Sequence, residues 1–146
     1  MSKLNAIHKA VYTLLTGDVI ITANVDADNI DLLEGVPAPA TKAIAYQADY
    51  ADHDIILPSG EYLLTVRVTV PEKITNAHDI RATITGRVVE LLKVANMNDS
   101  AEVVDNLRCR LIQLLGSTST YDPLIQVYNT EMTFRTICDD ATLTCS

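Results

Sequence analysis

Basic residues are scarce in this chain of 146 residues. It contains 11 Lys and Arg against 19 Asp and Glu, which gives a net charge of -8 at pH 7 with neutral His. Neutralising the phosphates of a nucleic acid takes clustered positive charge, so a DNA-binding surface would need a local basic patch against the overall field. The composition therefore argues against sequence-independent DNA binding.

Long apolar runs are also missing. No stretch approaches the roughly 20 consecutive apolar residues that cross a bilayer. Residues 1–10 follow an amphipathic pattern rather than a basic segment followed by an apolar block. We expect neither a membrane span nor a secretory signal, and we expect a protein that is made and kept in a cytoplasm.

Cysteine is rare, with Cys109, Cys138 and Cys145 and no CxxC pair. An odd number cannot close completely into disulfides. A bridge from Cys138 to Cys145 is sterically conceivable, but a cytoplasm would keep it open, so we expect reduced thiols. Arg108 and Arg110 could lower the pKa of the Cys109 thiol between them, but a position between two leucines of an expected helix favours a structural thiol.

Common catalytic signatures are absent. The sequence has no GxSxG elbow, no GxxxxGK(S/T) phosphate loop, no GxGxxG and no HExxH, so we expect no catalytic residue and no cofactor. Three aspartates surround His53, and carboxylate and imidazole groups together can ligate a divalent metal. This weak candidate site comprises Asp49, Asp52, His53 and Asp54. A solvated acidic turn explains the same cluster, and by that explanation there is no metal.

What the chain does contain is enough apolar material for one core. The hydrophobic share is 48%, which suits a single domain of this length. No repeat, low-complexity segment or linker divides the sequence, so we expect one domain over residues 1–138 and a C-terminal tail over 139–146. The order helix, strand, strand, strand, two helices, strand predicts an α+β fold, a two-layer sandwich of helices on a mainly antiparallel sheet.

Three segments show the three- and four-residue apolar spacing of a helix. Residues 3–16 end at Gly17, a helix-stopping residue. Residues 77–95 follow Asn76, a candidate N-cap. The third expected helix, residues 100–115, ends at Gly116.

Four segments alternate apolar and polar residues and predict strands. They lie near residues 19–25, 42–50, 61–70 and 124–138. The alternation is clearest in 61–70, which implies a sheet with one wet face. Residues 26–41 lose any pattern because acidic residues and prolines interrupt them, and they predict a long acidic loop.

Two features could make contacts between subunits. The acidic loop carries large aliphatics that often dock onto something; the candidates are Ile30, Asp31, Leu32, Leu33 and Glu34. Positive charge gathers on the second and third expected helices, at Arg81, Arg87, Arg108 and Arg110. Packing within the same domain explains the aliphatics equally well, and an ordinary solvated helix surface is the default explanation of the charges. The sharper hypothesis is a head-to-tail contact between the basic helical face and the next copy's loop, which closes a ring.

The order of elements resembles the tail-terminator and head-to-tail joining (neck) proteins of long-tailed bacteriophages. The resemblance rests on the opening helix at 6–15, the strand at 63–70, the helix at 88–92, the turn Tyr121-Asp122-Pro123 and the alternation in 132–135. The third helix and the acidic insert depart from the usual plan of that family. A neck connector or tail-completion subunit with the same core is the alternative.

This resemblance implies a structural virion protein, assembled in the host cytoplasm and located in the tail or neck. The family forms a ring, commonly a hexamer, that caps the tail tube, ends tube polymerisation and receives the filled head. Its implied partners are further copies of itself, the tail tube protein and a head-completion or connector protein, and DNA only passes through the channel. A metal-binding domain and an adaptor with a peptide-binding sheet edge are the competing hypotheses.

Overall fold

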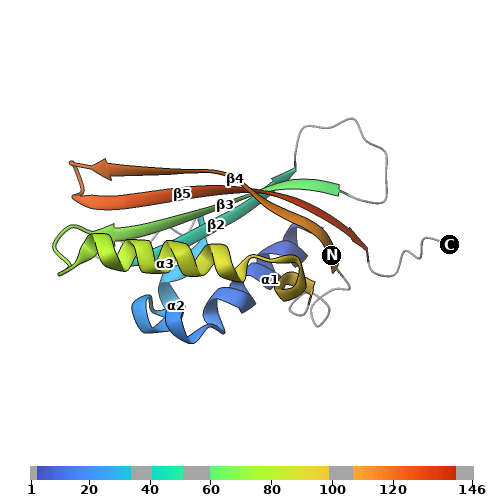
Figure 1. Cartoon of the computed structure of the whole chain (residues 1–146), viewed down its shortest axis with the longest axis horizontal. Helices are drawn as coiled ribbons and strands as arrows, with labels where there is room; N and C mark the ends of the chain where they lie inside the picture. Colours follow the sequence, from blue (N-terminus) through green and yellow to red (C-terminus); the bar gives the residue numbers. More distant parts are fainter. Residues whose placement is uncertain (1–2, 34–40, 51–59, 99–106, 141–146) are drawn as a thin grey trace.

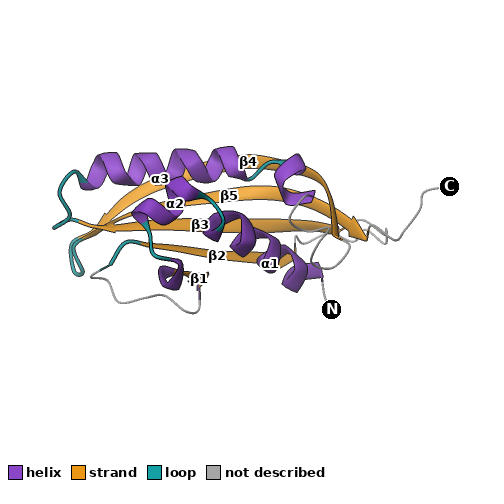
Figure 2. Ribbon diagram, turned by 90° about the horizontal axis from the view of Figure 1, so that it is seen from below, coloured by secondary structure: helices purple, strands orange, loops and turns teal. Residues whose placement is uncertain are grey.

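A computed structural model describes residues 3–33, 41–50, 60–98 and 107–140 of the chain. The described elements are α1 (Lys3–Thr16), α2 (Val19–Asn24), η1 (Ala27–Asn29), β1 (Ile30–Leu32), β2 (Ala43–Tyr50), β3 (Gly60–Pro71), α3 (Ala77–Leu91), β4 (Leu107–Asp122) and β5 (Val127–Asp140). The strands form one five-stranded sheet in the order β1-β2-β3-β5-β4 (Figure 1). Helices α1, α2 and α3 lie on the same face of this sheet (Figure 2). The expected α+β fold is confirmed.

The core forms where the helices meet the two central strands. Burial alternates along β3, as expected for a strand with one covered face. Leu64 faces Phe134 and Val66 faces Met132 across the β3–β5 pair, and all four side chains are buried. The expected strands near 42–50, 61–70 and 124–138 correspond to β2, β3 and β5.

Helices α1 and α3 supply the covering layer. Helix α1 has the predicted bounds and buries the face that includes Ile7, Val11 and Leu15. Helix α3 ends at Leu91 instead of continuing to residue 95, and a further short helical turn covers residues 94–98. No described helix is long and apolar enough to cross a membrane.

Residues 19–24 are helical, so the expected strand at 19–25 is wrong. The Asp18 carboxylate caps this helix, because its Oδ2 accepts a hydrogen bond from the Ile21 backbone N–H at 3.1 Å. Only Ile21 of the helix is buried. A local cap and tertiary contacts therefore override the alternation of apolar and polar residues that suggested a strand.

The expected helix at 100–115 is also wrong over its described part, because residues 107–115 belong to β4. This strand pairs antiparallel with β5 from Leu107 to Asp122, with irregularities between Cys109 and Leu111 and between Leu114 and Gly116. The leucines have helical spacing, but a long hairpin forms instead, because it satisfies the backbone hydrogen-bonding groups between its two strands. Residues 99–106 lie outside the described part.

The sheet is mixed rather than purely antiparallel. Residues Ile30–Leu32 form β1, which pairs parallel with β2. The segment expected to be an acidic loop, 26–41, therefore begins with η1 and a short edge strand, and residues 34–40 lie outside the described part. The expected tail begins within β5, since residues 139 and 140 continue that strand.

Candidate interaction surfaces

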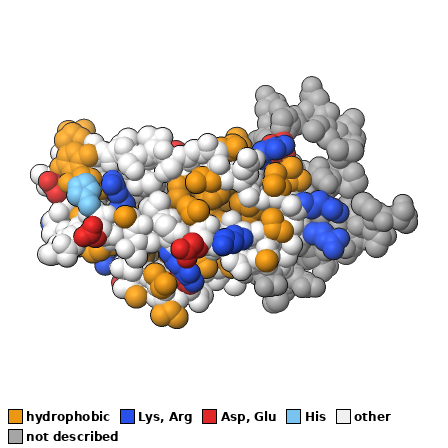
Figure 3. All heavy atoms as spheres, viewed as in Figure 1, with side chains coloured by type: hydrophobic (Ala, Val, Ile, Leu, Met, Phe, Trp, Pro, Cys, Tyr) orange, Lys and Arg blue, Asp and Glu red, His pale blue; other side chains and the backbone are white. Residues whose placement is uncertain are grey.

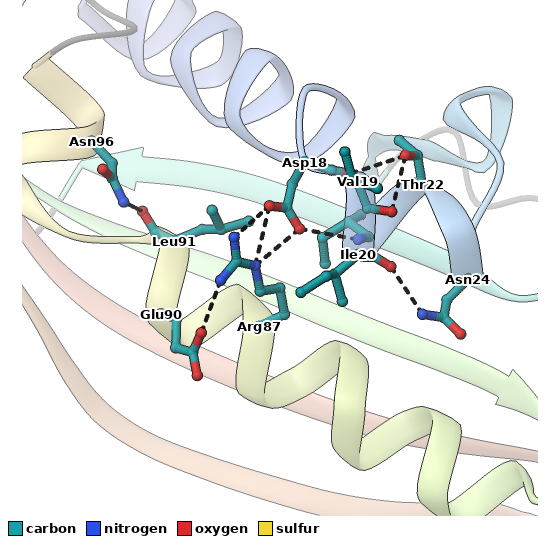
Figure 4. Close-up of polar contacts among 10 residues, drawn as sticks. Asp18, Val19, Ile20, Thr22, Asn24, Arg87, Glu90, Leu91 and Asn96 are labelled. Carbon is teal, nitrogen blue, oxygen red and sulfur yellow. Dashed lines mark hydrogen bonds and ion pairs between the residues drawn. The ribbon is translucent and has the colours of Figure 1, made fainter.

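An ion pair between Arg87 and Asp18 locks α2 against α3 (Figure 4). The Arg87 guanidinium donates from Nε to Oδ1 and Oδ2 at 3.1 and 3.0 Å, and from Nη2 to Oδ1 at 2.6 Å. Its Nη1 also donates to Glu90 at 3.0 Å. The hydrogen bonds from Arg87 are the main cause of the lowered pKa of Asp18, and the same bonds raise the pKa of Arg87. The Arg87 guanidinium is therefore engaged by carboxylates of its own subunit.

The other candidate arginines do not share one helical face. Arg81 lies on α3 with its guanidinium carbon 5.6 Å from the centre of the Tyr128 ring, a cation–π contact. Arg108 and Arg110 lie on the edge strand β4, where both are exposed. The expected basic face made by two helices is therefore wrong, because its second helix is a strand. The involvement of these arginines in subunit contacts stays a prediction.

The candidate loop residues are divided between the core and the surface. Ile30 is only 1% exposed and packs in the core of its own domain. Asp31 is exposed, and Leu32 and Leu33 are half-buried. Glu34 lies outside the described residues. Of the described members of this set, Asp31 is the most available to another molecule.

The candidate metal cluster is described only at Asp49. This exposed carboxylate accepts a hydrogen bond from Gln47 at 3.2 Å. Asp52, His53 and Asp54 lie outside the described part, and no group of metal-ligating side chains occurs within it. A metal site at 49–54 stays a prediction, which elemental analysis of the protein and of its His53→Ala variant would test.

The sheet face opposite the three helices is polar and electrically balanced in its described centre. Arg67 and Glu131 face each other across β3 and β5 and pair at 2.9 Å. Arg135 pairs with Glu61 on the same two strands. Thr69 donates to Asn129 at 2.7 Å. Because each of these arginines has a carboxylate partner, this face has little capacity to hold phosphates.

A tyrosine cluster fixes the end where β4 turns into β5. The Tyr121 and Tyr128 rings lie 5.0 Å apart, and His78 lies 4.3 Å from Tyr128. The Tyr121 hydroxyl donates to Glu72 at 2.6 Å. Leu124, at the tip beyond this cluster, is 92% exposed. Figure 3 shows hydrophobic side chains at this end of the molecule and a second group over α2.

The edge strand β4 was missed because leucine spacing suggested a helix. Every residue from Gln113 to Thr120 is exposed. A half-open hollow of about 620 Å³ lies alongside, lined by β4 residues 115–118 and 120, by β5 and by Arg67. The run Ser117 to Thr120, poor in helix formers, was the available sequence signal for a strand.

Cys109 lies in a different element from the expected one. It is buried in β4 and lies directly opposite Cys138 of β5. Its backbone N–H donates to the Asn98 side chain at 2.6 Å, and the Asn98 amide donates to the Cys109 carbonyl at 3.0 Å. The expectation of a structural position fits this burial, but the position is in a sheet. Cys145 lies outside the described residues.

Comparison with known proteins gives a structural likeness without a sequence relative. No family model matches the chain, and no curated protein matches it. A chain in the solved virion of a native gene transfer agent (GTA) particle has the same fold, with a TM-score of 0.72 and 16% sequence identity. The match covers 92% of this chain and 96% of that chain. At this identity the likeness shows a shared fold, and it extends over essentially the whole of both chains.

Proposed function

We propose that this chain is a structural protein of a phage-like virion. The observation that carries the proposal is the whole-length fold similarity to a chain of a gene transfer agent virion. The resemblance of the sequence to tail-terminator and neck proteins points in the same direction. The proposed role is structural rather than catalytic.

Within the virion, the role that fits best is a ring at the end of the tail tube. Such a ring ends tube polymerisation and joins the tail to the head, so its partners are further copies, the tail tube protein and a head-completion protein. The net charge of -8 suits a passage for DNA, because an acidic wall repels phosphates. The paired arginines of the polar sheet face suit it for the same reason.

Deletion of the gene in the strain that produces the particles tests this role. For a tail terminator we expect tails of uncontrolled, excessive length that lack heads in electron micrographs, and rescue by the wild-type gene. A neck connector, the second candidate, gives tails of normal length without heads. Unchanged particles after deletion would refute a virion role altogether.

Purified protein provides an independent test of the ring. Tail tubes from the same particles, mixed with the protein, should acquire a cap visible by negative stain and should stop elongating. A matched sample with a heat-denatured protein is the control. Tubes that continue to elongate at saturating protein would contradict termination, whatever the oligomeric state of the free chain.

A further inference from the structure

The outer edge of β4 is an unusual surface for a protein that stays in solution. Eight consecutive residues, 113–120, are exposed, so this stretch is open on both faces as well as along its edge. Leu114 and Leu115 are 42% and 54% exposed. The edge strand at the other side of the sheet, β1, is only three residues long. The β4 edge is therefore the longer of the two sheet edges at which another strand could pair.

Among the described residues, one side chain covers the beginning of this edge. The Asn98 side chain bonds both the N–H and the C=O of Cys109, as a neighbouring strand would. No comparable side chain reaches the β4 backbone from Ile112 to Thr120 within the described part of the molecule. Backbone groups that point away from β5 along this stretch are available to a further strand.

Natural edge strands are usually protected by charges, which are missing here. Residues 111–121, Leu-Ile-Gln-Leu-Leu-Gly-Ser-Thr-Ser-Thr-Tyr, contain no charged side chain and no proline. An uncharged, exposed strand edge pairs readily with other strands. In a chain with net charge -8, this strip is also where two copies can approach with the least repulsion.

The charges at the two ends of the strip favour one arrangement of a second copy. Arg108 and Arg110 precede it, and Asp122 follows it. When two copies of β4 lie antiparallel with the strips in full overlap, the basic end of each meets the acidic end of the other. A parallel arrangement brings like charges together.

The irregularity within β4 is compatible with that arrangement. A twofold axis between Leu115 and Gly116, next to the middle residue of the strip, falls where the register shifts between Leu114 and Gly116. Gln113 and Thr118 lie at equal distances from it, and they face Arg135 and Glu131, which share one face of β5. Residues that would oppose each other across two copies therefore lie on the same face, as cross-strand neighbours must.

We propose that the β4 edge from Leu111 to Tyr121 binds the same edge of a second copy, antiparallel and about a twofold axis near Leu115, which joins two sheets into one. The contact is isologous and ends at two copies, so it is separate from a head-to-tail contact that closes a ring. It also does not depend on the proposed role at the tail tube.

The test uses the symmetry of the midpoint. Sedimentation of the full chain should give a species of twice 16.0 kDa that dissociates on dilution. Leu115→Lys and Leu115→Glu each place two like charges side by side at the axis, so each should weaken association at least tenfold. An equimolar mixture of the two variants should restore the dimer, because each axis then holds one charge of each sign.

Val19→Lys is the control, since it places the same charge on an aliphatic side chain that is 80% exposed on α2, away from β4, and should leave association unchanged. Thermal melts must show that all variants keep the wild-type fold. Gly116→Cys, in a Cys145→Ser background, should crosslink to its own copy; a side chain at Gly116 meets no atom within 4 Å in the subunit. A monomer up to the solubility limit, or variants at residue 115 that associate like wild type, would overturn the proposal.

Discussion

Replacing Asp18 by Asn and by Ala separates two roles of one carboxylate. Asp18 caps α2 through the Ile21 N–H and also holds Arg87 of α3. Its side chain is only 9% exposed. Asn retains an oxygen that can cap the helix but removes the charge, whereas Ala removes both.

The two substitutions should differ in magnitude. A hydrogen bond to a charged group contributes about 1.5–3 kcal/mol against about 1 for a neutral one, so we expect Asp18→Asn to destabilise by about 1–2 kcal/mol. Losing the cap adds about 1 kcal/mol, which brings Asp18→Ala to about 2–3 kcal/mol. With an m-value of about 2 kcal/mol/M, urea midpoints should fall by roughly 0.5–1 M and 1–1.5 M.

The effect of Asp18→Asn should depend on pH in a defined direction. The folded protein lowers the pKa of Asp18 below its ordinary value of 3.8, chiefly through hydrogen bonds from Arg87. Its contribution to stability is therefore fully present above 3.8 and is lost as the pH falls through the lower folded pKa. Urea titrations at neutral pH and in acid should show the difference between wild type and Asn shrinking.

Asp26→Asn is the control, because Asp26 precedes η1 without a capping hydrogen bond from its side chain. It should leave the urea midpoint within experimental error. If Asp18→Asn were as mild as Asp26→Asn at neutral pH, or if its effect did not diminish in acid, the proposed coupling between α2 and α3 would be refuted.

Three further perturbations test other parts of the fold. Phe134→Ala removes a buried ring from the core and should destabilise by about 3–5 kcal/mol in urea unfolding, with Phe134→Leu much milder. His8 accepts a hydrogen bond from the Ala48 N–H, and burial is the main cause of its lowered pKa. The contribution of neutral His8 to stability is therefore present above pH 6.5 and is lost as the pH falls below it. His8→Gln should flatten this pH dependence of the free energy of unfolding. The hydrogen bond to Glu72 raises the pKa of Tyr121 to about 12, and Glu72→Gln should return its ultraviolet titration toward 10.

The regular parts of this fold were predictable because local pattern and tertiary environment agree there. Helix α1 keeps one apolar stripe, and β3 alternates strictly along its covered and open faces. In α2 the local pattern and the tertiary environment disagree. The alternation of apolar and polar residues suggests a strand, while Asp18 caps a helix and binds Arg87 from 69 residues away. A partner so distant in sequence leaves no local signal.

The edge strand shows the same limit for the candidate surface. Leucines at 107, 111, 114 and 115 repeat with helical spacing, but the decisive interaction is the pairing of β4 with β5. Exposure of both faces of β4 could not be deduced from sequence, because it depends on where the helices end over the sheet. The candidate arginines were identified by charge alone, and their partners, Asp18 for Arg87 and Tyr128 for Arg81, come from the fold.

The hairpin of β4 and β5 also bears on the order in which the chain folds. Its turn spans only residues 123–126, whereas β3 and β5 are separated by α3 and β4. Local pairings close with the smallest loss of chain entropy, so we expect the hairpin to form early and to dock later onto β3 as a unit. During that interval both long edges of the hairpin are open, and one of them is the uncharged strip. Refolding yield should therefore fall steeply with protein concentration, since the edge available to a second copy exists before the core that buries Phe134.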